Sequence, residues 1–182
     1  ASHRNGILRL MKALRHEAPD VSALKERLGV AEALAVGFHA QIRKHLGKCV
    51  MIRVLEPGVK QGAALAGAGI GGLADVGGKA GADHLARGEV GITVKSDQLD
   101  AFTAKAAVEV PGWARGCPPA LARIVTPVHE RDEVRLSAAL SRLAEADPML
   151  SLGQDQGSGH ALVRLQGPMH ERHVLGTLAD DF

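Results

Sequence analysis

The stretch "LSAALSRLAEADPMLSL", residues 136–152, predicts a helix that ends abruptly before a strand. Leu136, Leu140 and Leu143 recur at helical spacing and form one apolar stripe. Pro148 disfavours the helical conformation at the residue before it, so the helix is expected to end at Asp147. An apolar segment and the polar loop "GQDQGSGH" (153–160) come next, which is typical of a strand that leads into a turn.

The segments around this stretch predict an α/β unit over residues 118–182. "LARIVTPV" (121–128) is typical of a strand, and Asp132 is typical of a helix N-cap. The loop that contains glycine is typical of a hairpin, and "MHERHVLGTLADDF" (169–182) is typical of a second helix. The order β-α-β-β-α is most of a ferredoxin-like unit, which needs one more strand. Because a missing strand leaves a sheet edge unpaired, we expect the isolated chain to dimerise or to be disordered there.

Residues 32–104 have a different texture, with short apolar segments separated by glycine. "KCVMIRVL" (48–55) and "GEVGITV" (88–94) are examples, and turn signals recur about every ten residues, as in a small β-barrel. "RVLEPGVKQG" (53–62) is the clearest predicted hairpin, with its turn at Pro57 and Gly58. The fold class expected for the whole chain is therefore mixed β and α+β.

Two further segments complete the predicted organisation. Residues 1–31 contain a helix, "RNGILRLMKALRHEAP" (4–19), and a short linker with one helical turn that Gly29 caps. Residues 105–117 are expected to connect the barrel to the α/β unit. The first helix is expected to bury one apolar side, made of Ile7, Leu8, Leu10, Met11 and Leu14.

Composition limits the classes of function. The 182 residues are 46% hydrophobic and 23% charged, without a membrane-length apolar run or a signal peptide, so we expect a cytoplasmic protein. Aromatic content of 2% argues against a stacking platform for single-stranded nucleic acid. A net charge of +2 does not by itself indicate a nucleic-acid partner. Cys49 and Cys117 are far apart and are expected to be reduced thiols.

No motif in the chain predicts chemistry of its own. "GAGIGG" (67–72) matches G-x-G-x-x-G, but Gly77 and Gly78 would break the helix that a dinucleotide site requires, so a glycine-rich turn is favoured. "HERH" (170–173) places His170 and His173 on one side of a helix, without a third metal ligand. A complete phosphate loop and a nucleophile elbow are both missing from the sequence. We expect no catalytic, cofactor-binding or metal site.

The ordered set of segments resembles the elongation factor G family of translational GTPases. The third domain of that family has a helix that ends in Glu-Asp-Pro, and here Glu145, Asp147 and Pro148 match with Ala146 between them. "VRLQGPMHERHVLGTL" (163–178) is similar to the Gly-Glu-Leu-His-Leu-Glu segment, identical at Gly167 and His170. The second domain is matched by "GKCVMIRVLEPGVKQG" (47–62), "IGGL" (70–73) and "ARGEVGITV" (86–94).

The resemblance implies a piece of a five-domain protein. Residues 1–31 would be the end of the GTPase domain, 32–104 the second-domain barrel, and 118–182 an incomplete third domain. The longer protein would be a GTPase, and it would bind GTP and magnesium upstream of Ala1. This chain would therefore lack the GTPase activity. Departures such as Pro168, Arg172 and "DAFTA" (100–104) indicate a divergent paralogue.

The partner that the resemblance implies is the ribosome. The barrel would dock on ribosomal RNA through phosphate contacts, for which Lys48, Arg53 and Lys60 are the candidates. The third domain would couple the nucleotide state to movement. Two alternatives stay open: a ribosome protection or recycling GTPase of the same superfamily, and a stand-alone binding module built from a barrel and a ferredoxin-like unit.

Overall fold

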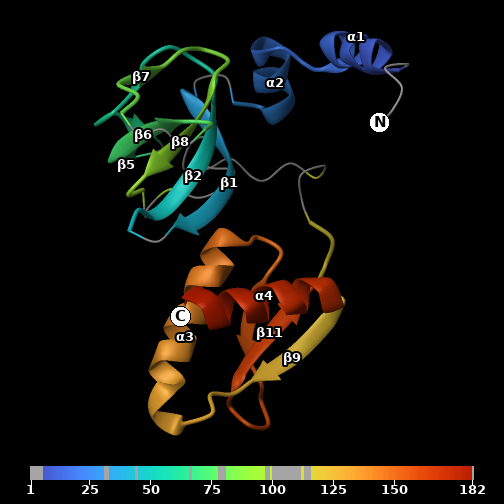
Figure 1. Cartoon of the computed structure of the whole chain (residues 1–182), viewed down its shortest axis with the longest axis vertical. Helices are drawn as coiled ribbons and strands as arrows, with labels where there is room; N and C mark the ends of the chain where they lie inside the picture. The colour runs from blue at the N-terminus through green and yellow to red at the C-terminus, as the bar shows by residue number, and fades with distance from the viewer. Residues whose placement is uncertain are drawn as a thin grey trace.

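The computed structural model describes residues 6–30, 33–43, 45–65, 67–77, 81–96, 99, 112 and 116–181. Two helices come first, and two lobes follow them (Figure 1). The first lobe, residues 33–99, contains strands β1 to β8, and the second lobe, residues 116–181, contains β9 to α4. Among the described residues, no helix is long and apolar enough to cross a bilayer. The domain boundaries given above stay a prediction.

Helix α1 spans Ile7–Glu17 as predicted, but its apolar side is not buried. Figure 1 shows it beyond α2, at the end of the molecule, and none of its residues is buried. The expectation of a buried stripe was therefore wrong for this chain, because no described segment packs there. The stripe has these exposed fractions: Ile7 48%, Leu8 82%, Leu10 59%, Met11 60% and Leu14 53%.

Helix α2, Val21–Leu28, is longer than the single turn that the sequence predicted. The side chain of Asp20 accepts the Ala23 N–H at 2.7 Å and so caps its first turn. Gly29 ends it in the left-handed conformation, as expected, with φ 67°. Its apolar side packs on a small cluster of the first lobe that contains Val30, Ala33, Val36 and Leu55.

The described residues of the first lobe form three antiparallel sheets. A four-stranded sheet has the order β1-β2-β8-β6, from Ala35–Arg43, Gly47–Val54, Val90–Val94 and Gly72–Asp75. Val59–Lys60 (β3) pairs with His84–Leu85 (β7), and Ala64–Leu65 (β4) pairs with Ala68–Gly69 (β5). These sheets share a core that includes Val50, Ile52, Val54, Leu65, Leu73 and Leu99. A closed barrel stays a prediction.

The predicted hairpin at residues 53–62 is only half right. The turn is present, and Gly58 has the positive φ of 113° that favours glycine. β3, the strand after the turn, does not pair with β2, the strand before it. Instead, β2 lies between β1 and β8, and β3 pairs with β7. The turn residues predicted the turn correctly, but they carry no information about which distant strand pairs with β3.

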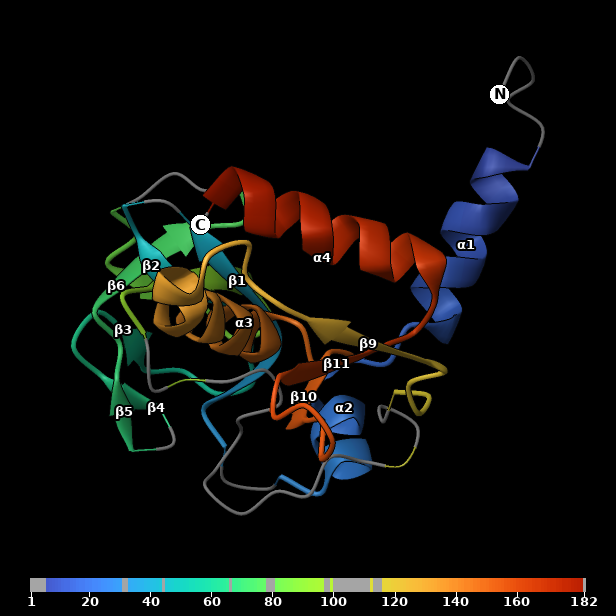
Figure 2. The same cartoon turned by 90° about the horizontal axis from the view of Figure 1, so that it is seen from below.

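The second lobe has the β-α-β-β-α order that the sequence predicted. Strands Leu121–Val125 (β9), Ser151–Gln154 (β10) and Ala161–Leu165 (β11) form an antiparallel sheet in the order β10-β11-β9. Two helices pack on this sheet (Figure 2): α3, Glu133–Ala146, and α4, Pro168–Asp181. A 3-10 turn at Glu130–Asp132 (η2) precedes α3. Its buried core consists of Leu140, Leu150, Val163, Leu165 and Val174.

The end of α3 shows why the chain leaves the helix so sharply. Asp147 is extended, with φ −118° and ψ 99°, as expected before a proline. Its N–H still bonds the Leu143 carbonyl, and its carboxylate accepts the Met149 N–H at 2.9 Å. Asp132, the predicted N-cap, lies at the start of α3 without a side-chain capping bond. The turn at Asp147 thus brings the chain directly into β10.

Candidate functional site: the joint between the lobes

The two lobes meet where β1 and the start of β2 face α3 and α4. A cleft of about 860 Å³ lies between these elements. Most of its polar lining can carry charge: His39, Arg43, His45 and Lys48 from the first lobe, and Arg142, Glu145, Asp147, His173 and Asp180 from the second. Because cationic side chains and carboxylates are mixed in its lining, the cleft does not favour ligands of one sign of charge over the other.

Lys48 is the buried charge of this joint. Its side chain is 5% exposed, and its Nζ lies 4.0 Å from Glu145 Oε2 across the two lobes. Glu145 is 55% exposed, so water screens the pair and its contribution to stability is small. The contact still identifies the last turn of α3 as the part of the second lobe that faces β2.

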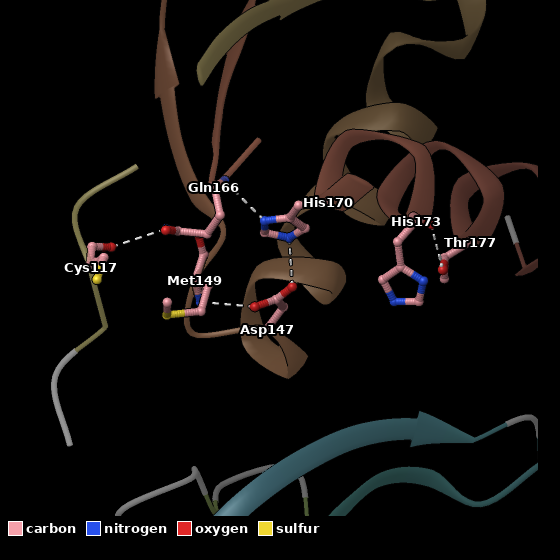
Figure 3. Close-up of polar contacts among 7 residues, drawn as sticks. All are labelled: Cys117, Asp147, Met149, Gln166, His170, His173 and Thr177. Carbon is pink, nitrogen blue, oxygen red and sulfur yellow. Dashed lines mark hydrogen bonds and ion pairs between the residues drawn. The ribbon is translucent and has the colours of Figure 1, made fainter. Parts of the chain in front are cut away.

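A short polar network holds the turn that follows α3 (Figure 3). His170 Nε2 lies 2.8 Å from Asp147 Oδ2, and His170 Nδ1 accepts the backbone N–H of Gln166 at 3.1 Å. Because Nδ1 is an acceptor, the neutral ring carries its proton on Nε2 and donates it to the Asp147 carboxylate. The network therefore joins the end of α3 to the start of α4.

Gln166 extends this network to the segment that enters the second lobe. Its side-chain amide Nε2 donates to the carbonyl oxygen of Cys117 at 3.0 Å and to that of Met149 at 3.4 Å (Figure 3). One residue between β11 and α4 thus contacts three separate parts of the chain. The sequence carries no signal for it, since a glutamine before a glycine fits any loop.

The histidine pair of "HERH" is divided between two roles. His170 bonds Asp147, whereas His173 lines the cleft. The Thr177 hydroxyl donates to the His173 carbonyl at 3.0 Å, a bond within α4. Across the described part of the chain, no group of three or more His, Cys, Asp and Glu residues could hold a metal ion.

The glycine motif lies among strands. Gly67, with φ 85°, is in the turn between β4 and β5, Gly69 ends β5, and Gly72 begins β6. A strand rather than a helix follows the motif, so the arrangement that a dinucleotide phosphate requires is not formed.

The three candidates for RNA contact do not lie in one patch. Lys48 is buried in the joint, Arg53 is half-buried on β2, and Lys60 is exposed on β3. Lys48 and Arg53 are five positions apart on one strand, so their side chains leave opposite faces. Contact with RNA stays a prediction for all three, and the burial of Lys48 makes it the least accessible.

The two cysteines differ in their surroundings. Cys117 is exposed, and Cys49 is buried on β2. Burial raises the pKa of the Cys49 thiol, and Arg43 lowers it by a smaller amount. Cys49 packs in a small cluster with Ala74 and Ile92, so packing explains this residue.

Comparisons with known proteins agree with the resemblance. An "Elongation factor G-like protein" of Synechocystis sp. is 24% identical over 181 residues, which is 95% of this chain and 27% of that protein. An "Oxytetracycline resistance protein" of Streptomyces rimosus is 38% identical over 66 residues, 36% of this chain and 10% of that protein. No protein-family model matches the chain.

A solved structure supports the fold. A crystal structure of a protein from Thermus thermophilus matches with a TM-score of 0.71 at 23% identity, over 96% of this chain and 28% of that one. The chain spans about a quarter of the length of this protein and of the Synechocystis relative. Because the sequence similarity to the Synechocystis protein covers 95% of the chain, it supports the resemblance to the elongation factor G family.

Proposed function

We propose that this chain is part of a translational GTPase of the elongation factor G type, which acts on the ribosome. The observation that carries the proposal is similarity over 95% of the chain to an elongation factor G-like protein. In this proposal the chain has no catalytic role. The first lobe docks on the ribosome, and the second lobe passes movement from the GTPase domain to the rest of the protein.

The GTPase domain would precede this chain in the longer protein and hold GTP and magnesium. The exposed apolar stripe of α1 supports this placement, because a soluble protein rarely leaves such a stripe uncovered. Residues 1–31 would then be the last part of that domain. The location expected for such a factor is the cytoplasm, where ribosomes are.

Contact with ribosomal RNA is proposed for the first lobe. Lys60 is exposed and Arg53 is half-buried, so both side chains can reach a phosphate from the surface of the lobe. Lys48 would need the joint between the lobes to open first, because its side chain is only 5% exposed. The proposal therefore ranks Lys60 and Arg53 above Lys48.

A second candidate function is protection of the ribosome against an antibiotic. The 38% identity to an oxytetracycline resistance protein over 66 residues favours it. That match covers about a third of the chain, whereas the elongation factor G-like match covers nearly all of it, so translocation-type function is preferred.

The proposal is tested in two steps. The coding sequence upstream of Ala1 should encode a strand followed by G-x-x-x-x-G-K-[ST], the loop that cradles phosphates. The longer protein should hydrolyse GTP faster when ribosomes are added, and tetracycline resistance on expression would identify the second function. A stand-alone binding module would instead have no phosphate loop upstream and no effect of ribosomes.

A further inference from the structure

Helix α2 lies on the first lobe through an apolar contact. The side chains of the helix that pack on the buried cluster of the lobe are Val21, Leu24 and Leu28. Burial of apolar surface is favourable but non-directional, so it does not by itself fix how the helix is turned on the lobe. With eight residues, α2 is also too short to be a stable helix without such contacts. Directional bonds between helix and lobe can supply a single position.

The first directional contact is an ion pair between α2 and the segment that follows β2. Lys25 Nζ, on the helix, lies 2.5 Å from Glu56 Oε1, on the lobe. The Lys25 side chain is 16% exposed and the Glu56 side chain 38%, so water screens this pair less than a fully exposed one. The Glu56 N–H donates to the carbonyl oxygen of Leu34 at 3.0 Å, which fixes its backbone to the lobe. The ion pair thus ties the helix to an anchored segment.

Arg87 makes a second contact, from the turn between β7 and β8. Its Nε donates to the carbonyl oxygen of Leu55 at 3.0 Å, and its Nη2 donates to the Ser22 hydroxyl of α2 at 2.9 Å. The neighbouring Gly88 also faces the helix, because a Cβ built there would lie 3.6 Å from Val21 Cγ2. One guanidinium group thus contacts both the lobe and the helix.

Glu56 is under the influence of both cations. The hydrogen bond from Lys25 holds the pKa of the Glu56 carboxyl below its ordinary value; burial opposes this, and the charges of Lys25 and Arg87 add to the lowering. The carboxylate is therefore charged at neutral pH. Together with Ser22, these three side chains form what we name the polar clamp: two groups on the helix and two on the lobe.

Helix α1 has no comparable attachment. None of its residues is buried, and residues 18–20, which join it to α2, are exposed. Within the described part of the chain, no hydrogen bond or ion pair connects α1 with either lobe. The two helices are therefore adjacent in sequence but differ in what holds them.

We infer that the polar clamp makes α2 a fixed part of the first lobe, and that the boundary between this lobe and the preceding unit lies at residues 18–20. The proposed GTPase domain then ends before α2 rather than at residue 31, and this one consequence rests on the proposed function. In that function α2 stays with the lobe that docks on the ribosome.

The experiment measures amide hydrogen exchange in the 182-residue chain by NMR. Glu56→Gln removes the charge on the lobe, and Lys25→Gln removes the charge on the helix. Each should raise the exchange rates of the α2 amides about two- to fivefold, while the amides of α1, β2 and β8 keep their rates. The double variant should exchange no faster than either single variant, because both substitutions remove the same ion pair.

Two further variants separate the clamp from a general effect on the helix. Ser22→Ala removes only the bond between Arg87 and the helix, and it should also raise the exchange rates of α2. The matched control is Glu26→Gln, which removes an exposed carboxylate from the same helix. The Glu26 side chain has no hydrogen bond or ion pair with the described residues, so the control should leave the rates unchanged.

Several results would overturn the inference. Unchanged α2 rates in the Lys25 and Glu56 variants, or an equal rise in the control, would show that the clamp does not hold the helix. Effects that add in the double variant would show that the two side chains act separately. A rise in α1 together with α2 would place no boundary between them. A failed phosphate-loop test alone would remove the proposed function and leave α2 fixed on the first lobe.

Discussion

His170 illustrates how one side chain can stabilise the second lobe without a catalytic role. Its ring is 12% exposed and has a hydrogen-bond partner on each nitrogen, Asp147 on one side and Gln166 on the other. Removal of the ring leaves the Gln166 N–H and Asp147 Oδ2 without the partner that each has in this partly buried place, although Asp147 Oδ1 still accepts the Met149 N–H. The cost of such groups exceeds the gain that each bond provides in the folded state.

His170→Ala should therefore destabilise the chain by about 1–3 kcal/mol in urea unfolding at neutral pH. His173→Ala is the control on the same helix, because His173 is exposed and should cost no more than about 0.5 kcal/mol. If the two variants lose the same stability, the network around Asp147 does not stabilise the lobe as described.

Individual residues also show where sequence reasoning reached its limit. The stop at Asp147 and Pro148 was predictable, because a proline acts on the residue beside it. The partners of Asp147 were not, since His170 is 23 positions away and its spacing from His173 drew attention to metal binding instead. Gln166 carried no signal at all, because its role depends on a carbonyl 49 positions away.

At the scale of elements, close packing of β8 against β7 depends on a glycine. A Cβ at Gly91 would overlap Leu85 Cδ1 and lie 3.1 Å from the Ala74 carbonyl oxygen. Leu85 belongs to the core of the first lobe, so it cannot move away freely. Steric restriction at Gly91 thus explains part of the high glycine content of this lobe.

Gly91→Ala should destabilise the first lobe by about 1–3 kcal/mol, through overpacking. Gly69→Ala is the matched control, because a Cβ there would have no atom within 4 Å. Both are measured by thermal unfolding followed by circular dichroism. Equal melting temperatures for the two variants would show that the approach of Leu85 to Gly91 is not tight.

The loop between β10 and β11 should make a pH-dependent contribution to stability. Asp155 accepts the side-chain hydroxyl and the N–H of Ser158, both at 2.7 Å, and these bonds hold the pKa of its carboxyl below the ordinary value. Because the folded pKa is lowered, the contribution is present at neutral pH and is lost as the pH falls through the folded pKa.

Asp155→Asn should therefore lower the melting temperature at neutral pH and have less effect in acid, below the folded pKa of Asp155. Melting temperatures of both proteins across the acid range provide the measurement. A difference that stays constant with pH would mean that ionisation of Asp155 does not contribute.

The elements themselves were mostly predictable, and their partners were less so. The bounds of α1, α3, β9 and β11 follow from periodicity, caps and turn residues that act locally. The pairing of β3 with β7 could not be predicted, because the four residues involved are too few to carry a pattern. The apolar side of α1 has the periodicity of a packed helix, yet the described chain covers none of it.

For the whole molecule, the joint between the lobes is the feature that the proposed function requires. The cleft and the contact of Lys48 with Glu145 lie between the two lobes, and the network around Gln166 lies within the second lobe and reaches the cleft at Asp147. Sequence reasoning predicted strands followed by a β-α-β-β-α unit, which is the order of the elements along the chain, while the domain boundaries stay a prediction. It could not identify the joint, because the joint depends on side chains from segments that only the fold brings together.

The most direct test of the central claim is sedimentation of this chain with purified ribosomes at increasing salt. We predict binding at low salt that weakens as salt rises, since phosphate contacts release counterions. Lys60→Gln should weaken binding and reduce the slope of log affinity against log salt by about 1. Lys12→Gln, on α1, should leave the slope unchanged. Absence of binding at low salt, or binding that does not depend on salt, would contradict a ribosome-docking role.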